Sequence, residues 1–187
     1  ATVVVVGMGG IGSWAAEALC RSGIGTLILI DLDDICISNT NRQLHALSTT
    51  VGKKKVDILR DRLLQINPEA RIDLVHDFIW PENVHGIIDN LTSLYNVTAV
   101  VDAIDGAIEK AALLAKCDEF RIPVVTCGGA AGLQNPGSIQ VRDLTEVYGD
   151  QLMTMTKREL RKRHGFKAGV PISQRRRLSP KWKIACV

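Results

Sequence analysis

A glycine-rich turn links a short apolar segment to a helix-like segment near the start of the chain, in VVVVGMGGIGSWAAEAL at residues 3–19. The pattern G-x-G-x-x-G is met by Gly7, Gly9 and Gly12, and Gly10 adds a fourth glycine. Glycines let the backbone turn sharply and approach phosphate oxygens, and the helix that follows presents free N–H groups and the positive end of its dipole. The turn therefore predicts a nucleotide site, without deciding between a dinucleotide such as NAD and a triphosphate such as ATP.

Apolar runs alternate with helix-like segments along most of the chain. TVVVV and TLILI are almost continuously apolar, as expected of strands covered on both faces, and further strands are expected in RIDLVH, NVTAVVDAID and PVVTCGG. Helices are expected from Ile11 to Arg21, from Val51 to Ile66 and from Ala107 to Phe120. This alternation predicts an α/β fold with a doubly wound, mostly parallel, Rossmann-like sheet, and SIQVRDL is expected as a later edge strand.

The charge of the chain is divided unevenly. Residues 157–187 hold 11 Lys or Arg and one acidic residue, a net charge of +10, whereas residues 1–156 carry a net charge of −7. We expect a nucleotide-binding domain over residues 1–147 and a basic, helical and irregular extension over residues 148–187, on the substrate side. Such an extension can bind a polyanion, and the alternative is a solvated basic tail.

The five cysteines are widely spaced and form no C-x-x-C pair, which argues against a disulfide framework or a four-cysteine zinc site. Cys20 and Cys117 are expected in helix core, Cys127 in strand core and Cys36 beneath its loop, while Cys186 is the one near a plausible substrate side. No apolar run approaches the roughly 20 residues of a membrane span, and no signal peptide is seen. A reducing compartment, the cytoplasm or an organelle, is expected.

Polar residues follow the second apolar strand, where they would face a bound nucleotide. Asp31 closes that strand 19 residues after Gly12, the position of a carboxylate that accepts hydrogen bonds from ribose hydroxyls. Arg42 lies in the loop that follows and can grip a phosphate with two N–H groups. Lys55 opens the next helix inside the site. Two cations beside a helix N-terminus suit a triphosphate better than a dinucleotide.

The fourth strand ends in VVDAID, which places Asp102 and Asp105 at the edge of the sheet where ligands bind in open α/β folds. A carboxylate beside a triphosphate is useful if it holds Mg²⁺, because this cation takes carboxylate and phosphate oxygens together. Asp105 is the better metal candidate, since Asp102 could instead cap a helix or accept structural hydrogen bonds.

Taken in order, GMGGIGSW, LIDLDD, SNTNRQ, VGKKK, INP and VVDAID resemble the ubiquitin-activating-like (ThiF/MoeB-type) adenylyltransferase superfamily from residue 3 to about residue 145. The resemblance implies that residues 1–147 bind ATP and Mg²⁺, with Asp31 on the ribose, Asn39 on the phosphates and Asp105 on the metal. It also implies that Arg42, Lys55 and Asp105 act in catalysis. The predicted nucleotide-binding residues are Gly7, Gly9, Gly10, Gly12, Asp31, Asp33, Ser38, Asn39, Arg42, Gln43, Lys55, Asp102, Asp105 and Gly106.

One branch of this superfamily is most similar. Gly106 stands where the sulfur-carrier branch usually has Asn, and the zinc-binding cysteine pairs of that branch are missing from this sequence. With GSWAAEAL, NTNRQLHAL and TCGGAAG, the chain resembles the branch that acts on threonylcarbamoyladenosine in tRNA. The resemblance implies adenylation of the threonyl carboxylate, cyclisation with loss of AMP, and a homodimer. The predicted tRNA contacts are Arg158, Arg161, Lys162, Arg175, Arg176, Arg177 and Lys181.

Two other functions stay open. The first is an adenylating activator of a ubiquitin-like or sulfur-carrier protein, with a sulfur-acceptor protein as partner, and the second is an NAD-dependent oxidoreductase. The basic segment favours tRNA over a carrier protein, and the cations that face the glycine turn argue against NAD. Trp182, within the basic segment, could stack on an unpaired base or pack in the core.

Overall fold

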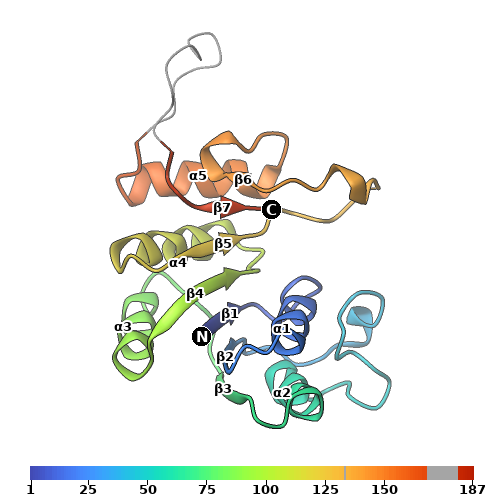
Figure 1. Ribbon diagram of the computed structural model, residues 1–187. Coiled ribbons are helices and arrows are strands. Elements are labelled where there is room, and N and C mark those ends of the chain that lie inside the picture. Colours follow the sequence, from blue (N-terminus) through green and yellow to red (C-terminus); the bar gives the residue numbers. More distant parts are fainter. Residues whose placement is uncertain (133, 168–180) are drawn as a thin grey trace.

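A single sheet of seven strands, in the order β3-β2-β1-β4-β5-β7-β6, organises the computed structural model, which describes residues 1–132, 134–167 and 181–187 (Figure 1). The strands are β1 (Thr2–Val6), β2 (Thr26–Ile30), β3 (Arg71–Val75), β4 (Val97–Asp102), β5 (Val124–Thr126), β6 (Arg142–Asp143) and β7 (Ala185–Cys186). The helices are α1 (Gly12–Arg21), α2 (Lys55–Ile66), α3 (Val84–Leu94), α4 (Ala107–Glu119) and α5 (Gln151–Arg163). The described pairs are parallel except β6 with β7, which confirms the predicted doubly wound α/β fold.

Both faces of the central strands are buried, as their continuous apolar sequences require. Val3 and Val5 of β1 point to the side covered by α1 and α2, where they join a core cluster with Leu59. Val4 and Val6 point to the other side, covered by α3, α4 and α5. Period-two alternation of side chains along β1 therefore divides the interior into two cores, one on each face of the sheet.

Helix α3 was not predicted from the sequence, in which the third expected strand is followed directly by the fourth. Strands β3 and β4 run parallel in the same sheet, so the chain between them must cross over, and α3 lies on that crossover. Its buried residues, Val84, Ile88 and Leu91, are spaced at three and four positions and face the sheet. Helix α2 begins at Lys55 and not at Val51, because residues 51–53 form a turn and a bend and Lys54 makes an isolated antiparallel bridge with Asp34.

The end of the chain joins the sheet, where the sequence analysis expected irregular chain. Strand β7 pairs in parallel with β5 and antiparallel with β6, and α5 packs against α4. Of the segment SIQVRDL, the structure forms a strand only at Arg142–Asp143. The division into residues 1–147 and 148–187 stays a prediction.

Trp182 packs in the interior, which is one of the two roles predicted for it; the other was stacking on an unpaired base. Its side chain is 8% exposed, its ring lies edge-on to Phe166 at 5.0 Å between centroids, and its Nε1–H donates to the carbonyl of Lys167 at 3.2 Å. Cys186 is also buried, so its thiol is not exposed to a substrate, and its place near the substrate side stays a prediction. None of the helices in the described part of the chain has both the length and the apolar character that a membrane crossing needs.

A buried ion pair joins α4 to the two strands beside it. Lys110 Nζ lies 2.8 Å from Asp102 Oδ2 and 3.1 Å from Thr126 Oγ1, and the Thr126 hydroxyl donates to the same carboxylate oxygen at 2.7 Å. All three side chains are buried completely. Each charge therefore depends on its partners, because water cannot reach them.

We expect Lys110→Met to lower the free energy of unfolding by about 3–5 kcal/mol, because it leaves the Asp102 carboxylate buried without its cation. Urea unfolding measures this loss. The matched control is Lys116→Met, on the same helix, whose partly exposed ion pair with Glu119 should contribute less than about 1 kcal/mol. Equal losses in the two variants would contradict the role given to Lys110.

Candidate nucleotide-binding site

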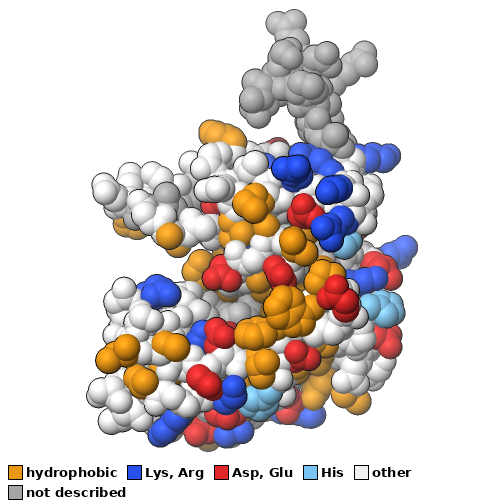
Figure 2. Space-filling view, turned by 180° about the vertical axis from the view of Figure 1, so that it is seen from behind, with side chains coloured by type: hydrophobic (Ala, Val, Ile, Leu, Met, Phe, Trp, Pro, Cys, Tyr) orange, Lys and Arg blue, Asp and Glu red, His pale blue; other side chains and the backbone are white. Residues whose placement is uncertain are grey.

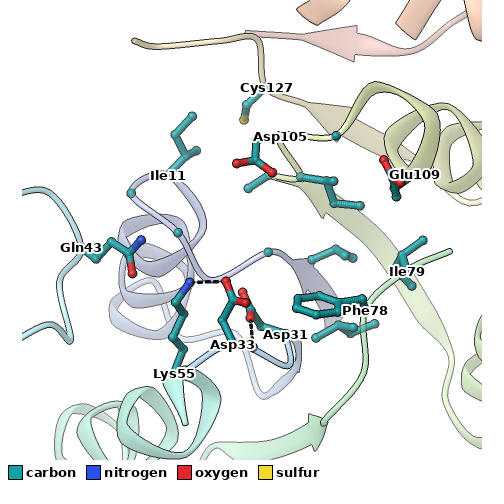
Figure 3. A pocket seen from close by; sticks show the side chains of 18 of the residues that line it. Ile11, Asp31, Asp33, Gln43, Lys55, Phe78, Ile79, Asp105, Glu109 and Cys127 are labelled. Atoms are coloured by element: carbon teal, nitrogen blue, oxygen red, sulfur yellow. Dashed lines mark hydrogen bonds and ion pairs between the residues drawn. The ribbon is translucent and has the colours of Figure 1, made fainter. Parts of the chain in front are cut away.

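A cleft of about 990 Å³ opens at the carboxyl ends of the central strands. It lies where the chain order reverses, since β1 pairs with β2 on one side and with β4 on the other. Open α/β sheets bind ligands at this switch point. Figure 3 shows side chains from the segment after β2, the start of α2 and the start of α4 around the same space.

The glycine turn between β1 and α1 forms one wall of the cleft, and two of its glycines are required by geometry. Gly7 has a φ of +87°, and a Cβ there would meet the carbonyl of Ala103 at 2.9 Å. A Cβ on Gly12 would lie 1.8 Å from the carbonyl oxygen of Gly7. Gly9 is different, because the nearest atom to its Cβ would be Gln43 Nε2 at 4.0 Å. Gly7 and Gly12 shape the turn, while Gly9 keeps its surface open to a ligand.

Asp31 is held in place by two backbone amides at the centre of the cleft. The N–H of Met8 donates to its Oδ2 at 2.6 Å, and the N–H of Asp33 donates to its Oδ1 at 2.7 Å. Burial raises the pKa of Asp31, and these two hydrogen bonds act in the opposite direction. The carboxylate is thus fixed beside the glycine turn.

The predicted phosphate grip lies on the α2 side of the glycine turn. Lys55 is 5% exposed, and its Nζ pairs with Asp33 Oδ2 at 2.6 Å (Figure 3). Arg42 lies over Gly10, and its Nη1 donates to the carbonyl of Ser38 at 3.2 Å and to Asn41 at 2.9 Å. The two cations are within one cleft, as the sequence predicts.

Two polar side chains near this grip have unpartnered atoms among the described residues. Gln43 lines the cleft, and its Oε1 is buried without a hydrogen-bond partner. Both ring nitrogens of His45 are likewise buried and unpartnered. Burial, with the nearby charge of Lys55 as the second cause, lowers the pKa of His45 to about 4. His45 is therefore neutral at physiological pH and adds no third cation.

The two aspartates of VVDAID have separate places. Asp105 lines the cleft and is exposed. Asp102 was expected beside the nucleotide, but its carboxylate is buried against Lys110 and also accepts the N–H of Ile104 at 3.1 Å. Asp102 is therefore structural, whereas Asp105 is available to a ligand. The described residues contain no cluster of three or more His, Cys, Asp or Glu arranged as a metal site, so a cation here would need ligand oxygens as well.

Most of the predicted nucleotide-binding residues line this cleft, and three do not. Gly12 lies inside the turn, Ser38 offers its carbonyl to Arg42, and Asp102 is buried. The residues that line it as predicted are Gly7, Gly9, Gly10, Asp31, Asp33, Asn39, Arg42, Gln43, Lys55, Asp105 and Gly106.

The sequence reading missed two further walls. One is the segment from Asp77 to Trp80 after β3, and the other is the segment from Cys127 to Ala131 after β5, with Leu152 of α5 beside it. Both follow carboxyl ends of strands, and that position is the signal that could have found them. Cys127 was expected in strand core but lies half-buried in the cleft wall, and burial raises the pKa of its thiol. Cys36, expected beneath its loop, is exposed.

Basic side chains gather on α5, as Figure 2 shows in the upper part of its view. Arg158 and Lys162 are exposed there. The guanidinium of Arg161 lies 5.3 Å from the ring centroid of Trp182, and Lys181 pairs with Glu146 at 3.2 Å. Predicted contacts outside the described residues are Arg175, Arg176 and Arg177.

Comparison with known proteins agrees with this geometry. The ThiF family model matches residues 1–169. The tRNA threonylcarbamoyladenosine dehydratase of Escherichia coli K12 is 47% identical over 165 residues, and that of Bacillus subtilis 168 is 40% identical over 171 residues. These matches cover 88% and 91% of this chain and 60% and 65% of the relatives, so the chain spans less than two thirds of their length.

A solved structure is similar over the whole chain. The crystal structure of E. coli tRNA N6-threonylcarbamoyladenosine dehydratase, TcdA, in complex with ATP has a TM-score of 0.88 and 44% sequence identity. The alignment covers 100% of this chain and 71% of that one.

We expect Gly12→Ala and Gly9→Ala to have different effects. A methyl group at residue 12 collides with the Gly7 carbonyl and should cost about 1–3 kcal/mol of folding stability or more, measured by urea unfolding. A methyl group at residue 9 meets no backbone atom within 4 Å, so stability should change by less than about 1 kcal/mol. Calorimetric titration with ATP should still show weaker binding, because that methyl group occupies the ligand side of the turn. Unchanged ATP affinity in Gly9→Ala would show that the turn is not part of the ATP-binding surface.

Proposed function

This chain belongs to the ThiF family, and from that membership we propose that it binds ATP with Mg²⁺ and activates a carboxylate as an acyl-adenylate. The observation that carries the proposal is the single cleft that brings Arg42, Lys55 and Asp105 to the glycine turn. NAD carries only the two charges of its pyrophosphate and keeps both phosphates during hydride transfer, so it does not require this group of charges. A triphosphate that is cleaved at its α-phosphorus does.

The chain's own cations would stabilise the charge that develops during adenylation. When a carboxylate oxygen attacks the α-phosphorus, negative charge builds on the phosphoryl oxygens and on the departing pyrophosphate. Lys55 is fixed by Asp33, and Arg42 is fixed by its bonds to Ser38 and Asn41, so both are oriented before the reaction. Preorganised cations stabilise such a transition state without first having to be ordered.

Asp105 fits the position of a magnesium ligand. Its carboxylate faces the cleft, close to the end of β4, in a part of the wall that also includes Gly106. Mg²⁺ is commonly bound by one or two carboxylates together with substrate phosphates and water, so Asp105 could serve as its one protein ligand. When bound, the ion would neutralise charge on the β- and γ-phosphates.

We propose the threonyl carboxylate of tRNA threonylcarbamoyladenosine as the acceptor. Its oxygen forms the bond to the α-phosphorus, and pyrophosphate leaves. The carbamoyl group of the same nucleoside then attacks the activated carbonyl carbon and loses a proton, and AMP leaves with the former carboxylate oxygen. The nucleophile belongs to the substrate, so Cys127 need not form a covalent intermediate. Relatives at 40–47% identity that are named for this dehydration support the choice.

A tRNA substrate also accounts for the basic side of the molecule and implies the cytoplasm or an organelle that contains tRNA. Phosphate contacts would come from the exposed cations of α5 and from residues 175–177. A homodimer is supported by large apolar side chains exposed on α1 and in the loop after β2, among them Trp14, Ile37 and Leu47. Activation of a carrier protein, or use of a sulfur-acceptor protein, is the rival function.

Arg42→Ala and Lys55→Ala should each lower the rate of AMP formation by roughly 10²–10³, because each removes a preorganised cation from the transition state. The assay incubates the protein with ATP, Mg²⁺ and tRNA that carries threonylcarbamoyladenosine, and mass spectrometry of the nucleosides detects the cyclic product. Lys53→Ala is the control, since Lys53 is exposed beside the same helix. Turnover of either variant near that of the unchanged protein would contradict the catalytic role of that residue. Tighter binding of NAD than of ATP with Mg²⁺ would contradict the proposed function.

Arg158→Ala together with Lys162→Ala should weaken tRNA binding and flatten the dependence of log affinity on log salt by up to about two units, since each phosphate contact contributes about 0.9 on a duplex. Filter binding at several salt concentrations measures the slope. A charge-matched control is Lys53→Ala together with Arg60→Ala, near α2, at the other end of the sheet (Figure 1). The same slope in both double variants would show that α5 makes no phosphate contacts.

A further inference from the structure

One end of the cleft has an apolar wall with a single glutamate beside it. Glu109 lies in the first turn of α4 and lines the cleft together with Phe78 and Ile79. In Figure 3 these three residues lie on the opposite side of the view from Lys55 and Gln43. Ile79 belongs to the same buried cluster as Ala111 and Leu114 of α4, which places this wall against the helix that carries Glu109.

Three of the other acids that line the cleft have partners, whereas Asp105, like Glu109, has none among the described residues; the Oδ1 of Asp77 accepts the N–H of Phe78 at 2.8 Å. Asp31 and Asp33 are occupied by backbone amides and by Lys55. Glu109 is half-buried, and among the described residues it forms no hydrogen bond or ion pair. Gly106 makes room for it, because a Cβ at that residue would lie 2.2 Å from Glu109 Oε2. The carboxylate is therefore directed into the cleft with its acceptor capacity unused.

The order of groups along the cleft assigns this end to the base. The phosphate grip is at Lys55 and Arg42, and Asp31 holds the central position where a ribose would bind. A nucleotide laid along this line places its base on the side of Phe78 and Ile79. Val6, Ile30 and Ile104 add further apolar side chains to the lining of the cleft. An apolar slot with one polar group at its edge is the usual form of a site for a flat heteroaromatic ring.

We propose that Glu109 accepts a hydrogen bond from the exocyclic amino group at C6 of adenine and so selects adenine over bases that lack a donor there. The proposal rests on the proposed function, which supplies ATP as the ligand. An ionised carboxylate only accepts hydrogen bonds, so it complements the two N–H groups of that amine. Guanine and hypoxanthine carry a carbonyl oxygen at the same ring position, and two acceptors would face each other in a partly dehydrated slot.

The test compares ATP with purine riboside triphosphate, which differs only by hydrogen in place of the amino group. Calorimetric titration with Mg²⁺ present should show that the unchanged protein binds ATP roughly 10- to 100-fold more tightly, the range expected for a hydrogen bond to a charged group. Glu109→Ala should reduce this ratio to about 1 while it leaves the affinity for purine riboside triphosphate nearly unchanged. Glu109→Gln should retain an intermediate ratio, because its amide oxygen still accepts.

Two further variants separate base reading from other roles. Gly106→Ala keeps the carboxylate but displaces it, so the ratio should fall here too. Glu119→Ala removes an exposed glutamate from the last turn of the same helix and should leave the ratio unchanged. An equal loss of affinity for both nucleotides in Glu109→Ala, together with a higher Mg²⁺ requirement, would overturn the proposal and make Glu109 a metal ligand. If the unchanged protein binds neither nucleotide, the proposed function itself fails.

Discussion

The close contact between the β1–α1 turn and the backbone that follows β4 sets the geometry of the cleft. Gly7 lies so near the carbonyl of Ala103 that no side chain fits between them, and Gly12 closes the turn against Gly7 in the same way. These contacts fix the start of α1 relative to the loop that carries Asp105. The helix N-terminus and the carboxylate thus face one space, although they are about 90 residues apart in the chain. A larger residue at either glycine would separate the two halves of the site.

The buried group of Asp102, Lys110 and Thr126 fixes the next element in turn. It ties the first half of α4 to β4 and β5, so the residues that precede and follow Lys110 on the helix are held in register with the sheet. Asp105 and Glu109 lie on either side of the helix start and inherit that position. Asp102 and Asp105, only three residues apart, therefore have different roles. The Asp102 carboxylate pairs with Lys110 inside the protein, whereas the Asp105 carboxylate faces the cleft.

Much of this arrangement could be predicted from the sequence, because the signals were local. The apolar runs of β1 and β2, the spacing of the glycines and the position of Lys55 at a helix start each depend on a few neighbouring residues. The parts that were missed depend on contacts between distant segments. Strand β7 has two residues and exists because β5 and β6 flank it, and Trp182 is interior because Phe166 and Arg161 pack on it. The sequence favoured Asp105 over Asp102 as the metal candidate, but it could not show that Asp102 is buried against Lys110 and therefore does not face the nucleotide.

Helix α5 connects the two surfaces on which the proposed reaction depends. At its start, Asp150 accepts the N–H of Met153 at 2.7 Å and that of Gly129 at 2.7 Å, which joins the helix to the cleft wall formed by residues 127–131. At its end lie Arg161, Lys162 and Arg163. A helix of 13 residues is roughly 20 Å long, so its two ends can contact well-separated parts of one large ligand. On the proposed function, a base that enters the cleft beside Leu152 would leave its strand lying along α5. The cations at the far end of the helix would then contact the backbone of that strand. The length of the helix would thus set the distance between the reaction site in the cleft and the phosphate-binding site.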